Sequence, residues 1–591
     1  MCGIFGMIGG GAVSNTLRAL KYLEYRGYDS AGIAVKGDGG LKIYKTEGRI
    51  QNLVDIVPQG LQGGTAIGHT RWATHGAVCA ENAHPFYSPD RNFAVVHNGI
   101  IENYLTLKEE LISQGAEFSS ATDSETVAHL LMREYNGDVL EAVQKTAKQL
   151  SGSFAIVIAT TYDQRLFAVK RRSPLVVGIG NGGVYLCSDI RCVSRWAEQV
   201  AVTPDNTIVV TGSDGVYFYD YEGNAVQVDF FDAEEVEEME QVKGEFMIKE
   251  IYEIPERIRL AKREYMRSGL QLNAETVRKF KRIYLIGCGT AYNSGLQVAA
   301  VARKLLDIDV LPVIASEFIY DNYPVDSKTL AFFISQSGET ADTIRACEKV
   351  KEQGGCTYAV TNTKSSQLAY ACDRTADISA GGEFAVASTK AYNCQLITLL
   401  LLMLDVAKIR GTLDVELYDR VVAAVDELPE AIDNILNDSY DIARLADEVK
   451  DCSAVFFIGR TTDYPTAAEG SLKLKEISYI HSEAYPAGEL KHGTLALMEE
   501  GVGVVAIATD GDLKEKMALS IKEVVARGAK VICVSPYKFE NAIPLAIPAV
   551  DKLLIGVVAV VPLQLLAYYT AKRLGRDVDK PRNLAKSVTV E

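Results

Sequence analysis

The stretch Arg282-Ile-Tyr-Leu-Ile-Gly-Cys-Gly-Thr-Ala-Tyr292 is an apolar run that ends in Ile-Gly and continues into a short polar loop before a helical pattern. The same arrangement returns at Ala454-Val-Phe-Phe-Ile-Gly-Arg-Thr-Thr-Asp-Tyr464. The two Ile-Gly pairs lie 172 residues apart, which is too far for a solenoid repeat. From roughly residue 250 onward, apolar strands alternate with long helical patterns. The duplication therefore predicts two similar doubly wound α/β domains.

The first part of the chain has a different pattern. Short β-type runs, such as 94–99 (AVVHNG) and 153–160 (SFAIVIAT), alternate with glycine turns and a few amphipathic helices. This pattern predicts an α+β domain with large sheets, and the acidic stretch at 232–245 marks its end. The expected organisation is a first domain at 2–232, a linker at 233–248, two α/β domains at 249–425 and 426–576, and a tail at 577–591.

Composition narrows the class of protein. The chain has 591 residues, and its formal charge of −16 argues against a nucleic-acid scaffold. Its 11 cysteines contain no CxxC pair, so they indicate reduced thiols in a cytoplasm, and no signal peptide is apparent. Residues 553–571 approach the length of a membrane span, but Gly556, Pro562 and Gln564 interrupt them. We expect a buried helix there.

Cys2, in the run Met1-Cys2-Gly3-Ile4-Phe5-Gly6, is the first candidate catalytic residue. If Met1 is removed, Cys2 carries both a thiol nucleophile and a free α-amine. Such an amine has a pKa of roughly 7.7–8.0 and can act as a general base at neutral pH. Taken alone, an inert cysteine remains the more common case.

Four further polar groups of the first domain suit attack on an amide. Asn98 and the backbone N–H of Gly99 are candidates for an oxyanion hole. Arg71 and Asp123 are candidates for the two charged ends of a free amino acid. Considered singly, a surface arginine, an Asn-Gly turn and a helix-capping aspartate are simpler explanations.

The second half contains a candidate phosphate loop and candidate imine chemistry. Ser335-Gln-Ser-Gly-Glu-Thr340 follows an apolar strand and precedes a helix, so its N–H and hydroxyl groups suit a phosphate, although a capped turn is equally plausible. The second copy has Ala508-Thr-Asp-Gly-Asp512 there, whose carboxylates would repel phosphate. Lys586, Glu476 and His492 are candidates for the amine, the carboxylate and the acid/base that amination of a ketose needs. Their spacing alone does not exclude a disordered lysine, a charged helix face and a surface histidine.

Four motifs of the first domain, CGIFG, RGYDSAG, HTRWATHG and HNGIIEN, resemble the class II glutamine amidotransferase family of N-terminal-nucleophile hydrolases. The resemblance implies a sandwich fold and release of ammonia from glutamine. It implies that Cys2 is nucleophile and base and that Asn98 and Gly99 form the oxyanion hole. The implied glutamine-binding residues are Arg71, Thr74, His75 and Asp123, and Trp72 would gate the route of ammonia. His84 and His97 are expected to be packed, hydrogen-bonded histidines.

The second half resembles paired sugar-isomerase (SIS) domains, and the terminal DVDKPRNLAKSVTVE is especially specific. The resemblance implies glutamine-dependent conversion of fructose 6-phosphate to glucosamine 6-phosphate, the first step of hexosamine synthesis. Lys586 would form the imine, Glu476 would move the proton between C1 and C2, and His492 of a neighbouring subunit would open the ring. The implied sugar-phosphate site contains Thr290, Ser335, Gln336, Ser337, Thr340, Val386, Ser388 and Lys473. Ala291 stands where many members have serine, which leaves one sugar contact in doubt.

Two alternatives remain at this stage. One is an amidotransferase that acts on phosphoribosyl pyrophosphate, and the other is a regulator that binds a sugar phosphate. Neither explains the whole set of motifs. We expect the partners to be glutamine and fructose 6-phosphate, with no nucleic acid and no membrane, in a cytoplasmic homodimer. No metal or redox cofactor is expected, because the chemistry is acyl transfer, imine formation and a proton shift.

Overall fold

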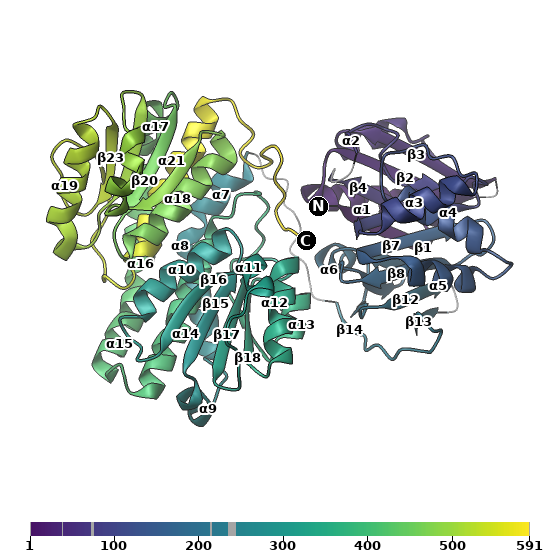
Figure 1. Ribbon diagram of the computed structural model, residues 1–591, viewed down its shortest axis with the longest axis horizontal. Coiled ribbons are helices and arrows are strands. Elements are labelled where there is room, and N and C mark those ends of the chain that lie inside the picture. The colour runs from purple at the N-terminus through teal and green to yellow at the C-terminus, as the bar shows by residue number, and fades with distance from the viewer. Residues whose placement is uncertain (1, 38, 73–75, 213–214, 234–243, 590–591) are drawn as a thin grey trace. The chain divides into compact units, whose positions relative to one another are not determined.

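The computed structural model describes residues 2–37, 39–72, 76–212, 215–233 and 244–589. The chain forms two compact units, which are treated separately below. Unit 1 consists of Met1–Glu238 with Ser587–Glu591, and unit 2 of Met239–Lys586. The two predicted α/β domains therefore belong to one compact unit. The fold class is the predicted one, an α+β sandwich followed by two α/β domains (Figure 1).

Unit 1 contains two antiparallel sheets. The larger has the strand order β14-β11-β9-β10-β1-β4-β2-β3, and the smaller has the order β13-β12-β8-β7-β6-β5. In spatial order the larger sheet contains β14 (Phe231–Asp232), β11 (Gln199–Val202), β9 (Val176–Gly180), β10 (Gly183–Cys187), β1 (Gly3–Gly9), β4 (Thr65–Arg71), β2 (Ser30–Gly37) and β3 (Gly40–Glu47). The smaller contains β13 (Gly215–Asp220), β12 (Thr207–Gly212), β8 (Leu166–Arg171), β7 (Gly152–Thr160), β6 (Phe93–Ile101) and β5 (Phe86–Tyr87).

Helices cover the outer faces of both sheets, so unit 1 has four layers (Figure 1). Strand β1 illustrates the reason, because its side chains alternate between two cores. Phe5 and Met7 pack in the core that holds α1, α2 and α6, whereas Ile4 faces the core between the sheets. The helices are α1 (Ala12–Leu23), α2 (Ile50–Ile56), α3 (Tyr104–Ser113), α4 (Glu125–Glu134), α5 (Val139–Gln149) and α6 (Ile190–Val193).

Unit 2 contains the duplication. Its two parallel five-stranded sheets have the orders β16-β15-β17-β18-β19 and β21-β20-β22-β23-β24, which correspond strand for strand. The first contains β15 (Arg282–Gly287), β16 (Asp309–Ile314), β17 (Thr329–Ser335), β18 (Cys356–Thr361) and β19 (Arg374–Asp377). The second contains β20 (Ala454–Gly459), β21 (Ser482–Pro486), β22 (Val502–Ile507), β23 (Lys530–Ser535) and β24 (Ile543–Ala546).

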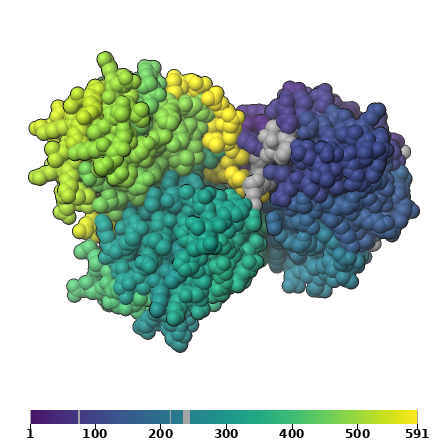
Figure 2. Space-filling view, in the orientation of Figure 1, coloured from purple at the N-terminus to yellow at the C-terminus, as the bar shows by residue number. Residues whose placement is uncertain are grey.

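In both sheets the strand order reverses beside the first strand, and ligands of open α/β sheets bind at such a point, outside the carboxyl ends of the strands. The two halves share one continuous apolar core and lie against each other within unit 2 (Figure 2). The helices of the first half are α7 (Phe246–Tyr252), α8 (Ile254–Ser268), α9 (Ala274–Lys279), α10 (Thr290–Ala302), α11 (Ala315–Tyr320), α12 (Ala341–Glu352), α13 (Gln367–Ala371) and α14 (Lys390–Arg410). Those that follow are α15 (Val415–Ala424), α16 (Leu428–Asn437), α17 (Ser439–Val449), α18 (Asp463–Ser478), α19 (Lys514–Val525), α20 (Ile555–Ala559) and α21 (Val561–Arg573).

The predicted linker and the C-terminal tail both make contacts that the sequence does not indicate. Helix α7 begins at Phe246, inside the range predicted as a linker, and its Met247 is fully buried. In the tail, Asp579 accepts hydrogen bonds from the backbone N–H groups of Phe246 and Met247, at 2.9 and 2.8 Å. These contacts join residues that are far apart in the chain, so no local sequence pattern predicts them.

Within the residues that the structure describes, two apolar helical segments are long enough to cross a membrane, Lys390–Arg410 and Ile555–Arg573, but 83% and 89% of their most apolar windows are buried inside the protein. Core helices pass the same length test. The second segment is the one predicted to be a buried helix, and that prediction is confirmed. The helix is interrupted at Val560, and Pro562 lies in the first turn of α21.

Candidate functional site

The thiol of Cys2 lies where β1 begins beside the end of β4. Antiparallel pairing of Gly3 with Thr70 brings Cys2 next to Trp72. The backbone N–H of Trp72 donates to Sγ of Cys2 at 3.2 Å, and Sγ lies 3.4 Å from the carbonyl oxygen of Trp72. Burial raises the pKa of the Cys2 thiol. The thiol is therefore protonated near neutral pH and needs a base before it can attack.

Asn98, on β6 of the other sheet, reaches the same place. Its Nδ2 donates to the carbonyl oxygen of Cys2 at 2.9 Å. Nε2 of His69 lies 3.1 Å from Oδ1 of Asn98 and 2.9 Å from the carbonyl oxygen of His97. Burial lowers the pKa of His69 to about 3, so the ring is neutral, and because both neighbours are acceptors, Nε2 carries the proton. His69 thereby orients the Asn98 amide with Nδ2 toward Cys2.

Gly99 follows Asn98 in a conformation that requires glycine. Its φ is +120°, and a Cβ there would lie 2.0 Å from the carbonyl oxygen of Ser153. A side chain at this position would displace the backbone that forms the candidate oxyanion hole.

The candidate glutamine-binding residues that the structure describes, Arg71 and Asp123, are both buried in unit 1. Arg71 ends β4 and donates to the carbonyl oxygens of Ala77 and Gly76 at 3.3 and 3.4 Å. Asp123 accepts from the backbone N–H of Ile101 at 2.9 Å. Thr74 and His75 lie outside the described residues.

Three aromatic residues complete the description of this region. The ring of Trp72, the candidate gate, meets that of Tyr28 edge-on with centroids 5.8 Å apart. His84 stacks on His69 at 4.0 Å, and Nδ1 of His97 lies 2.8 Å from Oγ of Ser124. His84 and His97 are thus buried, packed and hydrogen-bonded, as predicted.

In unit 2, the loop after β17 forms a tight cradle before α12. Oγ of Ser335 accepts from the N–H of Gly338 at 3.0 Å and lies 2.9 Å from Oγ1 of Thr340. A Cβ on Gly338 would lie 2.0 Å from Oγ of Ser366, so only glycine allows this turn. Ser337 accepts from the N–H of Glu339 at 3.1 Å. The turn and the helix N-terminus together suit an anion.

Gln336 of the same loop supports a ligand there. Its Nε2 is buried and has no hydrogen-bond partner within the part of the chain that the structure describes. A buried donor without a partner is costly unless a ligand or water satisfies it.

The corresponding loop of the second copy is already filled by carboxylates. Asp463 accepts from the N–H of Thr509 at 2.9 Å and from its hydroxyl at 2.5 Å, and Asp510 accepts from the N–H of Asp512 at 3.0 Å. Burial raises the pKa of Asp463 to about 6, so this carboxyl is mainly ionised at neutral pH. The arrangement agrees with a phosphate site in the first copy alone.

Residues from the two halves of unit 2 meet at the N-terminus of α10. Nζ of Lys473 donates to Oε2 of Glu476 at 2.6 Å and to Oγ1 of Thr290 at 2.9 Å. Glu469, which the sequence analysis missed, accepts from Thr290 at 3.0 Å and from Asn293 at 2.8 Å. Burial raises the pKa of Glu469 to about 7. Lys473 is almost completely buried, so the two carboxylates are what make its charge tolerable.

Lys586 lies beside a second missed acid. Its Nζ pairs with Oε2 of Glu383, and the two side chains are 4% and 0% exposed. The hydroxyl of Ser388 donates to the same oxygen at 2.8 Å. The N–H of Val386, two residues earlier, donates to the carbonyl oxygen of Asp579 in the tail at 2.9 Å. Ser388 and Lys586, predicted separately, are therefore joined by Glu383.

His492, predicted to open the sugar ring, lies at the surface. It ends the 3₁₀ turn Glu489–His492 and is exposed. Among the residues that the structure describes, it makes no hydrogen bond or ion pair with the clusters above.

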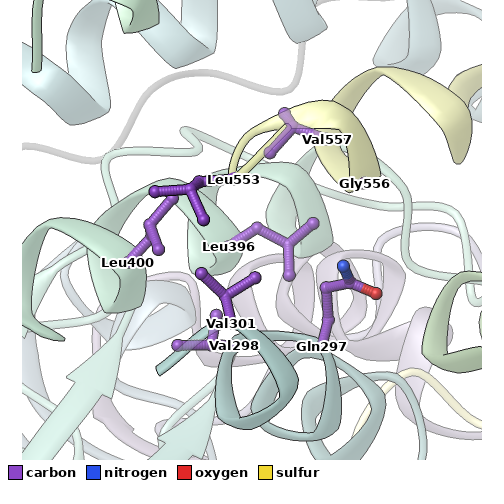
Figure 3. A pocket seen from close by; sticks show the side chains of 8 residues that line it. All are labelled: Gln297, Val298, Val301, Leu396, Leu400, Leu553, Gly556 and Val557. Atoms are coloured by element: carbon purple, nitrogen blue, oxygen red, sulfur yellow. The ribbon is translucent and has the colours of Figure 1, made fainter. Parts of the chain in front are cut away.

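A small cavity lies elsewhere in unit 2 and does not mark the site. It has room for about one water molecule and is lined mainly by Val298, Val301, Leu396 and Leu400 (Figure 3). Its one polar side chain, Gln297, accepts a hydrogen bond from Thr466 at 3.1 Å. None of the predicted site residues lines it.

Glu250 of α7 is buried near the Glu383 loop. Its Oε1 accepts from the N–H groups of Phe384 and Ala385, whereas Oε2 is buried without a partner among the described residues. Burial and the negative charge of Glu383 raise the pKa of Glu250 to about 8. Glu250 is therefore mainly uncharged at neutral pH.

This carboxyl should make stability fall as the pH rises. In an unfolded chain this carboxyl has a pKa of about 4.3. Between that pH and about 8 the folded protein therefore binds one more proton than the unfolded chain, and the free energy of unfolding falls as the pH rises. Glu250→Gln keeps the acceptor oxygen but cannot ionise. We expect its Tm to match the wild type at about pH 5 and to exceed it at about pH 9, measured by scanning calorimetry. A Tm difference that is independent of pH would contradict the raised pKa.

The comparisons with known proteins agree with this description. A glutamine amidotransferase domain model matches residues 69–195, and a SIS domain model matches residues 276–404 and 448–571. Two proteins named glutamine–fructose-6-phosphate aminotransferase (isomerizing), from Caldanaerobacter subterraneus subsp. tengcongensis and Thermus thermophilus, are 45% and 43% identical over the full length of both chains.

Among solved structures, the C-terminal domain of glucosamine-fructose-6-phosphate aminotransferase from Francisella tularensis is 35% identical. The match covers 58% of this chain and all of the Francisella chain, with a TM-score of 0.55. A putative phosphosugar isomerase from Clostridium difficile, at 24% identity and a TM-score of 0.50, shares the fold; the match covers 57% of this chain and 96% of that one.

Fold and sites together define a glutamine amidotransferase joined to a pair of sugar-isomerase domains. Within that class, full-length identity of 45% decides the family. The chain belongs to the glutamine–fructose-6-phosphate aminotransferases (isomerizing). This membership argues against both alternatives, the phosphoribosyl pyrophosphate enzyme and the regulator.

Proposed function

We propose that this enzyme converts glutamine and fructose 6-phosphate into glutamate and glucosamine 6-phosphate. The observation that carries the proposal is that Thr290 from one isomerase half contacts Lys473 of the other half, which in turn contacts Glu476. The chain is also related over its full length to glutamine–fructose-6-phosphate aminotransferases. A site shared by both halves explains why the duplication is needed.

In unit 1, the thiolate of Cys2 attacks the amide carbon of glutamine, with the α-amine as base once Met1 is removed. The C–N bond breaks as the thioester forms, ammonia leaves with the proton that the α-amine holds, and water then hydrolyses the thioester to glutamate. The negative charge that develops on the amide oxygen is stabilised by Nδ2 of Asn98 and the N–H of Gly99. Nδ2 of Asn98 lies 2.9 Å from the carbonyl oxygen of Cys2, and this closeness to the nucleophile supports the role of Asn98 in the oxyanion hole. The proposed glutamine-binding residues are Arg71, Thr74, His75 and Asp123, and Trp72 gates the passage of ammonia.

In unit 2, the phosphate of the sugar occupies the loop after β17, and Lys586 forms an imine with the ketose carbonyl. Glu476 moves the proton between C1 and C2, and Lys473 neutralises the charge beside it. His492 opens the sugar ring. The proposed sugar-phosphate contacts are Thr290, Ser335, Gln336, Ser337, Thr340, Val386, Ser388 and Lys473.

Ammonia passes from one active site to the other inside the protein, because ammonia released into water at neutral pH is protonated and loses its nucleophilicity. The exposed position of His492 supports a homodimer in which each subunit supplies this histidine to its partner. We infer a cytoplasmic enzyme whose partners are its two substrates and a second copy of the chain, with no nucleic acid or membrane. The proposed reaction steps involve no metal or redox cofactor.

Product analysis tests the function directly. Glutamine labelled with heavy nitrogen in its amide is mixed with fructose 6-phosphate and unlabelled ammonium. We expect labelled glucosamine 6-phosphate, with little dilution by the unlabelled nitrogen. An unchanged sugar would contradict the proposed reaction, and full dilution would contradict internal transfer of ammonia.

A further inference from the structure

We propose that Glu383 accepts the proton of Lys586 and so prepares this amine for imine formation. The proposal rests on the role of Lys586 in the proposed function. Glu383 belongs to no motif of the sequence analysis, and it was found through its contact with Lys586, 203 residues away in the chain.

The two oxygens of Glu383 have different tasks. Oε1 accepts from the N–H groups of Thr389 and Ala391, at 2.9 and 3.1 Å, and so satisfies donors at the start of the 21-residue helix α14. Oε2 faces the hydroxyl of Ser388 and Nζ of Lys586. The carboxylate is thus fixed in position by the helix, while its other oxygen is directed at the amine.

The surroundings favour an ionised Glu383. Burial alone would raise its pKa, but the positive charge of Lys586 and the backbone donors of α14 lower it. The neighbouring carboxyl of Glu250 is mainly uncharged at neutral pH and does not compete as an anion. The negative charge of Glu383 also helps Glu476 and Glu469 to raise the pKa of Lys473, so it acts on the cluster around Thr290 as well.

Imine formation needs a base at the amine, and the buried carboxylate of Glu383 is in contact with Nζ of Lys586. A lysine ammonium has no lone pair, so its proton must leave before nitrogen attacks the carbonyl carbon. Glu383 takes that proton, nitrogen bonds to carbon, and the resulting carbinolamine loses its hydroxyl as water, with the proton returned by Glu383. One water is released, and the protonated imine remains opposite the Glu383 carboxylate, so atoms and charge balance.

Glu383→Gln separates this role from helix capping. The amide oxygen can still accept from Thr389 and Ala391, whereas the amide nitrogen that replaces Oε2 cannot take a proton from Lys586. We expect glutamine-independent synthesis, with ammonia as nitrogen source, to fall by roughly 10²–10⁴-fold in kcat, which is typical for loss of a general base. The KM for fructose 6-phosphate should change little.

The decisive measurement is the pH profile of imine formation. The imine with fructose 6-phosphate is trapped with cyanoborohydride at each pH, and peptide mass spectrometry locates the lysine that carries the sugar. In Glu383→Gln, trapping at Lys586 should fall by about 10²-fold or more near neutral pH. It should recover as the pH rises, because hydroxide can then remove the proton in place of the carboxylate. Glu383→Asp, which keeps a carboxylate, should restore part of the rate.

Glu253→Gln is the matched control. It removes the carboxylate that pairs with another buried lysine, Lys390, and does not contact Lys586. This variant should retain the wild-type trapping profile even if its Tm falls. A Glu383→Gln enzyme with the wild-type rate and profile would overturn the inference, and so would one that is slower by the same factor at every pH. If the wild type is not trapped at Lys586, the proposed function itself fails.

Discussion

Replacement of Cys2 by alanine is expected to abolish glutamine-dependent synthesis of glucosamine 6-phosphate while leaving ammonia-dependent synthesis close to that of the wild type. The loss of the nucleophile should lower glutamine-dependent kcat by on the order of 10³-fold or more. The two activities separate because Cys2, Asn98 and His69 belong to unit 1, whereas the Lys586 and Thr290 clusters belong to unit 2.

The measurement compares product formed from glutamine with product formed from a high concentration of ammonium, in the same preparation. Cys79→Ala is a suitable control, because Cys79 is another partly exposed thiol of unit 1. It should behave as the wild type with both nitrogen donors. A Cys2→Ala enzyme that still uses glutamine would remove Cys2 from the nucleophile role, and loss of both activities would show that the variant damages more than the glutaminase site.

The second large effect is expected for Lys586→Arg. Arginine keeps the positive charge opposite the buried Glu383 but stays protonated and cannot form an imine. Synthesis from either glutamine or ammonium should fall by on the order of 10³-fold or more. Hydrolysis of glutamine by unit 1 should persist, which shows that the protein is folded.

The readouts for this variant are sugar product, glutamate release and mass-spectrometric detection of the reduced sugar adduct. Lys572→Ala provides the control, because Lys572 is a partly exposed lysine whose partner is Glu245. Wild-type synthesis by Lys586→Arg, or a sugar adduct on another lysine in the wild type, would contradict the proposed imine.

Much of the fold follows from local patterns. The strands expected at 94–99 and 153–160 lie within β6 and β7, and the helix expected after Asp123 is α4. The Ile-Gly pairs end β15 and β20 at equivalent positions of two sheets with the same strand order. Alternation of apolar residues and strand–loop–helix junctions are properties of short segments, so a sequence displays them directly.

Other parts of the candidate sites carry no local signal. Glu383, Glu469 and His69 are single polar residues whose partners lie 203, 179 and 29 residues away. Glu383 and Glu469 each lie in segments where a solvated acid is the ordinary expectation. Only the packing of distant elements shows that these side chains are buried and what they contact.

The sequence by itself determined the class of this enzyme, its two α/β copies and the candidate reactive groups, because motifs combine a residue type with a local backbone form. The tertiary structure decided how those groups are prepared for reaction. His69 orients Asn98, Glu469 and Glu476 flank Lys473, and Glu383 holds Lys586. Proton positions and charge depend on distances of about 3 Å between residues far apart in the chain, and only the folded protein sets those distances.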